Sequence, residues 1–346
     1  MPGYHAVMAT FVAITGNDSV FSLRAATLIF GFLTIMMFFM ILNNTASQFK
    51  YLRTLQFATL PLVFVFFYLI YTDILSLLFI LVMIYFSNRK QYILAGIFGI
   101  CSMLIRQNNI IWISIVPFMY FLDHWNIQGV SDLIKETIKK MWVFILALFL
   151  FILFIIVNDG VAVGDASSHP AFKFSTGNLF FFLFCVFVFF LPFQIYYLKE
   201  VFVFVYKNRI VWVASFLIFL VYWYTFNPDH PYNALAPHYF LRNLILTKIT
   251  QSDFFKLLFF MPVLYSVWLL YLMPLRNKVY YLLYPLTVLF LTPSWLIEQR
   301  YYIIPVVLFL IFRKPLSKPV EIIQFCYNII LLALLMPLIL AGKAFL

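Results

Sequence analysis

The chain of 346 residues is 65% hydrophobic and only 10% charged, and its mean hydropathy is +1.01. Soluble domains are roughly half apolar and about a quarter charged, so this composition excludes an ordinary soluble protein and predicts a membrane protein. The net charge of +11 would suit a nucleic-acid partner in a soluble protein. Here the basic residues lie in short loops between apolar runs, which indicates membrane topology and no nucleic-acid partner.

The apolar runs are continuous, as in residues 143–157, and continuous runs are typical of membrane-spanning helices. We therefore expect an all-α, polytopic membrane helical bundle that forms a single domain over residues 1–346. Its membrane segments, about 11–12 in number, are expected near 20–42, 58–71, 74–86, 92–105, 110–122, 141–157, 179–197, 210–226, 257–273, 279–291, 303–312 and 322–340. Several are shorter than the roughly 20 residues of a straight span, so we expect some to extend into their polar flanks.

Charged residues distinguish the two sets of alternate loops. One set carries 15 of the 23 Lys and Arg residues, at 43–57, 87–91, 123–140, 198–209, 274–278 and 313–321. The positive-inside rule predicts that this set faces the cytoplasm. The opposite, lumenal or extracytoplasmic face then receives 1–19, 71–76, 106–109, 158–178, 227–256 and 292–302, with four of the five histidines. Side chains capable of chemistry are therefore concentrated on one face.

Two charged residues of that face lie between apolar runs with almost no loop around them. A charge such as Asp73 costs about 2.5–3.5 kcal/mol at membrane depth on insertion scales. Asp73 caps a helix that starts at Ile74 or takes part in a site, and the two roles are compatible. Arg106 forms a structural pair with Asp73 or contacts a phosphate, with the amides of Gln107 and Asn108 suited to sugar hydroxyls.

Further candidates lie in three other stretches of the same face. Glu298, Arg300 and Tyr301 precede an apolar segment, and an arginine at this depth is well placed for a lipid-linked phosphate. The loops at 164–169 and 227–243 add Asp165, His169, His230, His238 and Tyr239. Their spacing matches no recognised ligand set, so we expect no metal and no other cofactor. The chain contains no nucleophile elbow, P-loop or dinucleotide fingerprint.

Taken in order, several short motifs resemble those of a known family, the dolichyl-phosphate-glucose-dependent α-1,2-glucosyltransferases. The matching stretches are "PGY" (2–4), "SLR" (22–24), "YTD" (71–73), "RQNNIIW" (106–112), "GDASSH" (164–169), "HPY" (230–232), "HY" (238–239) and "RYYIIP" (300–305). Each motif is weak alone, but their shared order from residue 2 to residue 305 is fairly specific. The resemblance implies a polytopic fold of the GT-C glycosyltransferase type.

The resemblance also implies a reaction and its partners. Glucose would move from a polyprenyl (dolichyl) phosphate donor to a lipid-linked oligosaccharide acceptor on the lumenal face. Such a transfer needs a carboxylate as general base and cations that stabilise the departing phosphate, for which we expect Arg106 and Arg300. A eukaryotic source would place the protein in the endoplasmic reticulum membrane, and a bacterial source in the plasma membrane.

The sequence departs from the family pattern in two places. The family's first membrane helix and acidic lumenal loop would precede Met1-Pro2-Gly3, so we expect an N-terminally truncated chain whose residues 1–17 form a lumenal re-entrant segment. The catalytic carboxylate is then unknown. The loop at 227–243 reads "LAPHY" where the family has an Asp-Asn pair, which leaves the acceptor open. Alternative functions are another GT-C transferase, a transporter of lipid-linked sugars and an inactive scaffold.

Overall fold

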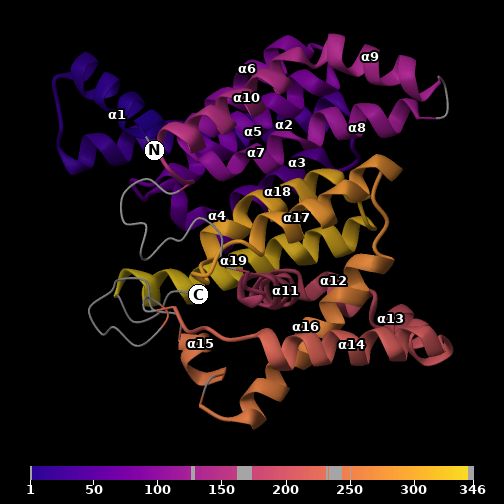
Figure 1. Ribbon diagram of the computed structural model, residues 1–346. Coiled ribbons are helices and arrows are strands. Elements are labelled where there is room, and N and C mark those ends of the chain that lie inside the picture. Colours follow the sequence, from indigo (N-terminus) through magenta and orange to yellow (C-terminus); the bar gives the residue numbers. More distant parts are fainter. Residues whose placement is uncertain are drawn as a thin grey trace.

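The computed structural model describes residues 2–125, 129–161, 174–230, 233, 244–249 and 251–341. The described residues are helical with no strand, and one isolated bridge joins Leu275 to Arg313. Figure 1 shows two layers, with the helices of the N-terminal half above those of the C-terminal half. The expected all-α bundle is confirmed.

The described residues of the N-terminal layer form ten α-helices. They are α1 (Pro2–Thr15), α2 (Val20–Asn44), α3 (Lys50–Ala58), α4 (Pro61–Phe64), α5 (Thr72–Asn88), α6 (Tyr92–Ile105), α7 (Ile110–Ile113), α8 (Ile115–His124), α9 (Val130–Lys140) and α10 (Trp142–Val157), with 3-10 turns η1 (Val65–Phe67) and η2 (Gln107–Asn109). Neighbours α2, α5, α6 and α10 pack in that order. A Cβ on Gly96 of α6 would lie 2.6 Å from Val143 of α10, so glycine permits this close helix contact.

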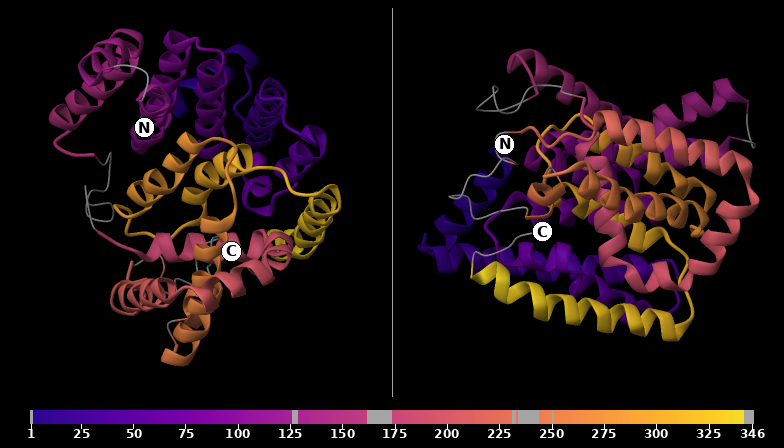
Figure 2. Two further views of the ribbon diagram at one scale, coloured as in Figure 1. Left: turned by 90° about the vertical axis from the view of Figure 1, so that its right-hand side faces the viewer. Right: turned by 90° about the horizontal axis from the view of Figure 1, so that it is seen from below.

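The C-terminal layer contains α11 (Gly177–Phe189), α12 (Leu191–Tyr196), α13 (Leu198–Lys207), α14 (Arg209–Thr225), α15 (Leu244–Ile249), α16 (Asp253–Leu272), α17 (Leu283–Leu291), α18 (Ile303–Phe312) and α19 (Lys318–Leu340), with 3-10 turns η3 (Lys278–Leu282) and η4 (Gln299–Tyr302). Every residue of α18 is buried. A helix that is apolar on all sides belongs in the centre, and α18 lies on the side of its layer that packs against the N-terminal layer (Figure 1). Seen from below, α19 runs along one edge (Figure 2, right).

The number of membrane crossings stays a prediction. Among the described helices, three are long and apolar enough to span a membrane, or six if each of three bent pairs is one span. Five further apolar helices have 10–17 residues, which is short for a straight crossing. The helix α1 is present where the re-entrant segment is expected, and it packs on α6 through Gly3, whose Cβ would lie 2.5 Å from the Leu104 carbonyl oxygen.

Two predicted segments are wrong as continuous spans. Segment 58–71 is broken into α4 and η1, which bend 110° away from α5. Leu60 is extended because the proline that follows it disfavours helical backbone at the preceding residue, so α3 ends before Pro61. Segment 179–197 is divided between α11 and α12, with Pro192 at the start of α12. Proline lacks the N–H that would continue the earlier helix, and this divides the run.

Two predicted cytoplasmic loops contain amphipathic helices. Helix α9 lies in 123–140 and bends 75° from α10, and α13 lies in 198–209 and bends 100° from α14. Both carry charged residues on one side and exposed apolar residues on another, such as Ile134 and Phe202. A helix of this kind at a sharp bend from an apolar helix is typical of the membrane interface.

The structure gathers each set of loops at its own end of the bundle. Arg53 donates to the main chain of Leu310, and Arg276 donates to Thr45 Oγ1 at 2.7 Å, so loops of the basic set meet. At the other end, Arg106 contacts both Asp73 and Tyr301. The end that carries Arg53 is the one predicted to face the cytoplasm.

Candidate active site

The first part of the site is an ion pair between two tight turns. Helix α5 begins at Thr72, so Asp73 lies in its first turn and is not the cap; the residue at the cap position is Tyr71, and its side chain makes no capping hydrogen bond. The capping alternative for Asp73 is therefore wrong. Helix α6 ends at Ile105, and Arg106 turns into extended backbone, which directs its guanidinium to Asp73. The predicted pair is present, with 13% of the Arg106 side chain and 2% of the Asp73 side chain exposed.

A buried asparagine holds this turn against the start of α5. Asn109 is fully buried, and its amide nitrogen donates to Ser76 Oγ at 2.6 Å and to Ser102 Oγ at 2.7 Å. Since Ser76 is on α5 and Ser102 is on α6, one side chain links the two helices that carry Asp73 and Arg106. Of the polar residues at 106–109, Asn109 is therefore structural.

The second part of the site comes from the segment before α18. Glu298 and Arg300 form an ion pair, with 2.6 Å between Oε2 and Nε. The Arg300 guanidinium carbon lies 5.5 Å from the ring centre of Tyr71 and 5.4 Å from that of Tyr301. The Arg106 guanidinium carbon also lies 5.4 Å from the Tyr301 ring. One tyrosine therefore brings together two arginines that are 194 positions apart in the sequence.

Asn178 at the start of α11 positions this second segment. Its buried amide nitrogen donates to the carbonyls of Ser294 (2.8 Å) and Leu296 (2.7 Å). Its Oδ1 accepts from the Glu298 main-chain N–H at 3.2 Å and from the Tyr302 hydroxyl at 2.9 Å. All four partners lie between 294 and 302, so one side chain sets the path of the segment that carries Glu298 and Arg300.

Burial and the nearby charges do not all shift the pKa of Glu298 in the same direction. Burial raises the pKa of Glu298 above its ordinary value, and although Arg300 opposes this shift, the negative charge of Asp73 adds to it. The charges of Asp73 and Arg106 act on Glu298, so the two ion pairs lie close enough to influence each other.

The site keeps hydrogen-bonding capacity for a ligand. Asp73 Oδ2 is buried and has no hydrogen-bond partner among the described residues. A guanidinium has five N–H donors, and within the described chain Arg106 donates only to Asp73. Two such guanidinium groups, largely buried and oriented by carboxylates, can hold the oxygens of a phosphate.

A family model, the DIE2/ALG10 family, matches residues 2–130 and 121–311, which together cover most of the chain. The chain belongs to the DIE2/ALG10 family. Similar curated proteins are the Dol-P-Glc:Glc(2)Man(9)GlcNAc(2)-PP-Dol alpha-1,2-glucosyltransferases of Candida albicans, Drosophila melanogaster and Homo sapiens. The three identities are 26%, 25% and 26%, over 82%, 74% and 77% of this chain.

The chain spans just under two thirds of the length of these relatives, with 66%, 64% and 64% of each covered. No solved structure matches the chain. The resemblance read from the short motifs is thus confirmed at the level of the family, and the GT-C type of the fold stays a prediction.

The structure places the remaining predicted residues of this DIE2/ALG10 member less centrally. Gln107 is half-buried and donates to the Val161 carbonyl at 3.0 Å, and Asn108 is also half-buried. His230 is fully buried, with its ring edge-on to Trp295 at 4.6 Å, so it packs on the segment that leads to Glu298. Four predicted residues lie outside the described residues: Asp165, His169, His238 and Tyr239.

Metal binding stays untested for this family member. Among the described residues, no group of three His, Cys, Asp or Glu side chains is close enough to hold a metal ion. Because four of the predicted residues are not described, the expectation of no metal remains a prediction.

Sequence reasoning missed Tyr71 and Asn178. Tyr71 belongs to the "YTD" motif, so the motif itself carried a signal that its first residue lines the site. Asn178 stands in the polar "STGN" start of a long apolar run, where it reads as an ordinary helix boundary. Its role depends on the position of residues 294–302, more than 110 positions later, and no local pattern indicates that.

Proposed function

We propose that this protein is a membrane glycosyltransferase that moves glucose from a polyprenyl (dolichyl) phosphate carrier to a lipid-linked oligosaccharide. The observation that carries the proposal is the convergence of Arg106 and Arg300 on Tyr301, each held by a carboxylate. The names of the relatives support the choice of donor, sugar and acceptor.

The charges of the site suit the departure of a phosphate. A polyprenyl phosphate sugar is a phosphodiester with one negative charge, and the bond from C1 of the sugar to the phosphate oxygen breaks during transfer. Negative charge then grows on the phosphate, and prearranged cations stabilise that growth more than they stabilise the bound donor. Asp73 and Glu298 keep Arg106 and Arg300 oriented before the donor arrives, which removes a cost of reorganisation from the reaction.

The position of the site favours an enzyme over a transporter. A transporter of lipid-linked sugars would place polar residues near the middle of the membrane and would show repeat symmetry. Here Asp73, Arg106 and Arg300 all lie in turns at one end of the helices. The proposal includes the endoplasmic reticulum membrane as the location and the lumenal side as the side of transfer.

A transfer assay tests the proposal. Membranes that contain the protein are supplied with radiolabelled polyprenyl phosphate glucose and a lipid-linked oligosaccharide, and labelled acceptor is measured. We expect transfer by the unchanged protein and loss of transfer by Arg106→Ala/Arg300→Ala. Lys248→Ala removes an exposed cation from the same predicted face and serves as the matched control. Full transfer by the double variant would overturn the assignment of the site, and no transfer by the unchanged protein would overturn the function.

A further inference from the structure

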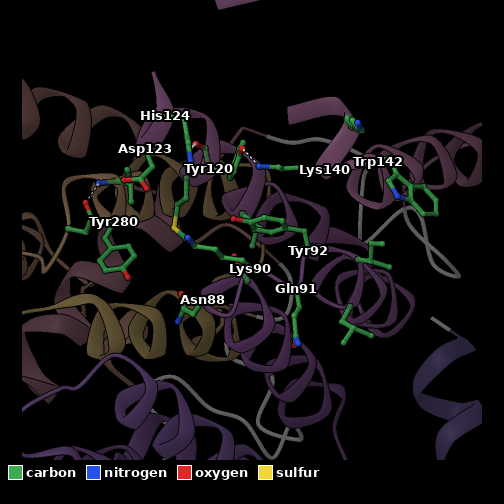
Figure 3. Close-up of a pocket in the computed structure, with 18 residues that line it drawn as sticks. Asn88, Lys90, Gln91, Tyr92, Tyr120, Asp123, His124, Lys140, Trp142 and Tyr280 are labelled. Carbon is green, nitrogen blue, oxygen red and sulfur yellow. Dashed lines mark hydrogen bonds between the residues drawn. The ribbon is translucent and has the colours of Figure 1, made fainter. Parts of the chain in front are cut away.

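A polar cavity lies at the end of the bundle opposite the candidate active site. It has a volume of about 790 Å³ and opens between the turn from α5 to α6, helix α8, the junction of α9 and α10, and the start of η3. Figure 3 shows Lys90 and Tyr92 below Tyr120 and Lys140, with Trp142 at one side. Its loops belong to the set that is predicted to face the cytoplasm.

The lining carries more positive than negative charge. Lys140 is 2.5 Å from Glu136 and 3.0 Å from the Tyr120 hydroxyl, so this lysine is engaged. Lys90 and Lys139 are exposed, and among the described residues no carboxylate lies within ion-pair distance of either. Asp123 is the acidic residue of the lining. Two lysines without an ion pair and one carboxylate leave a local excess of positive charge.

The backbone at Lys90 ends helix α5 at the rim of the cavity. Its φ is +60°, in the left-handed region that is common where helices end. The N–H of Gln91 donates to the Phe86 carbonyl at 2.9 Å, which completes the helix end. Lys90 therefore leaves the helix where its side chain lines the cavity.

Helix α9 has the pattern of a helix at the level of lipid headgroups. Val130, Ile134 and Ile138 follow a spacing of four residues, so they lie on one face, and they are 49%, 44% and 52% exposed. Leu133, on another face, is fully buried against the protein. An amphipathic helix at a 75° bend from an apolar helix is expected to lie along the membrane surface with its exposed stripe in the lipid. Trp142 at the bend is 50% exposed, as tryptophans of the membrane interface are.

We propose that this cavity binds the phosphate-bearing headgroup of an anionic lipid from the predicted cytoplasmic leaflet. Lys90 and Lys139 contact the phosphate, while Tyr92, Tyr120 and Trp142 line the wall beside it. A lipid is favoured over a soluble phosphate because α9 brings the opening of the cavity to the headgroups. The inference is independent of the proposed transfer reaction, which takes place at the other end of the bundle.

Lipid binding to the purified full chain tests this inference. The probes are dioctanoyl phosphatidylserine, dioctanoyl phosphatidylcholine and inorganic phosphate, each titrated while the unfolding temperature and the lipid retained in native mass spectrometry are measured. We expect stabilisation by phosphatidylserine only. Lys90→Gln/Lys139→Gln weakens the apparent affinity by roughly tenfold or more, because each lysine near the headgroup contributes electrostatic attraction. Lys90→Arg/Lys139→Arg restores it.

The matched control is Lys135→Gln, which removes a lysine from the same helix but outside the cavity, where its side chain is 77% exposed. This variant keeps the affinity of the unchanged protein within about twofold. Equal loss in Lys135→Gln and in Lys139→Gln would show general surface attraction and overturn the site. If inorganic phosphate stabilises the protein as much as phosphatidylserine does, the bound phosphate group need not come from a lipid, and the proposal of a lipid ligand is overturned. The single exposed variant Lys139→Gln keeps the test decisive if the double variant fails to fold.

Discussion

Two arginine–carboxylate clusters at opposite ends of the bundle differ in how completely they are satisfied. At the basic end, Arg313 and Glu321 are both fully buried and form a bidentate pair, with two bonds of 2.7 Å. Both carboxylate oxygens of Glu321 accept further bonds, at 2.7 Å from Leu316 N–H and 2.8 Å from Gln56 Nε2. At the end that carries the candidate active site, Asp73 Oδ2 has no partner among the described residues, and Arg106 and Arg300 remain partly exposed.

This difference distinguishes the structural cluster around Arg313 and Glu321 from the candidate site around Asp73 and Arg106. Glu321 joins α19 to α3 through Gln56, and Arg53 of α3 donates to the Leu310 carbonyl on α18, so the basic end connects three helices. A buried carboxylate with every oxygen satisfied has nothing left for a ligand, whereas the Asp73–Arg106 pair and the Glu298–Arg300 pair keep donors and acceptors free. Similar residue types therefore serve two purposes, and the completeness of the hydrogen bonding of the carboxylates tells them apart.

The largest effect should come from breaking the structural cluster. Glu321→Ala leaves the Arg313 charge buried without a partner, and such a loss destabilises a protein by about 3–5 kcal/mol. We expect little monodisperse protein in size-exclusion chromatography and a sharply lowered unfolding temperature. Lys318→Ala, in the exposed first turn of the same helix, is the control. A stable Glu321→Ala protein would remove the contrast between the two clusters.

Arg106→Ala should lower the activity by more than it destabilises the fold. Loss of one prearranged group that stabilises developing charge lowers kcat by roughly 100- to 1,000-fold. The unfolding temperature should fall less than in Glu321→Ala, because the buried Asp73 loses its ion-pair partner but the positive charge of Arg300 remains near it. Arg106→Lys keeps the charge but not the fork of donors, so we expect partial activity. Equal destabilisation by both alanine variants would make Arg106 structural.

Tyr301 should matter through its ring face. A cation–π contact is worth about 0.5–2 kcal/mol, so Tyr301→Leu should raise KM for the donor by roughly 2- to 30-fold. Tyr301→Phe keeps the ring beside Arg106 and Arg300 and should resemble the unchanged protein. Donor titrations of the two variants separate these cases, and a matching defect in Tyr301→Phe would point to the hydroxyl instead.

The smallest expected effect is a pH dependence of stability at Glu298. Its pKa is raised by burial, so the folded protein holds this proton more tightly than the unfolded chain. The contribution is present below the ordinary pKa of glutamate and is lost as the pH rises through the raised pKa. Glu298→Gln cannot titrate and should lack this fall, which unfolding midpoints from acidic to neutral pH would show. The exposed Glu200→Gln is the control, and identical pH profiles for all three proteins would contradict the prediction.

The amino-acid sequence is enough to predict the all-α membrane bundle and the concentration of basic residues in one set of loops, and it offers the pair of Asp73 with Arg106 as one of two alternatives. These follow from local information, since apolar run length, loop charge and two isolated charges beside short turns are all visible in the chain. The stripe of Val130, Ile134 and Ile138 is equally visible, yet residues 123–140 are expected to form a loop because charged residues lie among the apolar ones.

The tertiary structure is needed to show which charges come together in the candidate site and which hold the fold together. The convergence of Arg106 and Arg300 on Tyr301 depends on how turns far apart in sequence are brought to one end by the packing around α18. The link from Asn178 to residues 294–302 and the saturation of Glu321 likewise join distant segments. Hydrogen-bond satisfaction depends on neighbours in three dimensions. Residue type and spacing alone could therefore not distinguish the Asp73–Arg106 cluster from the Glu321–Arg313 cluster.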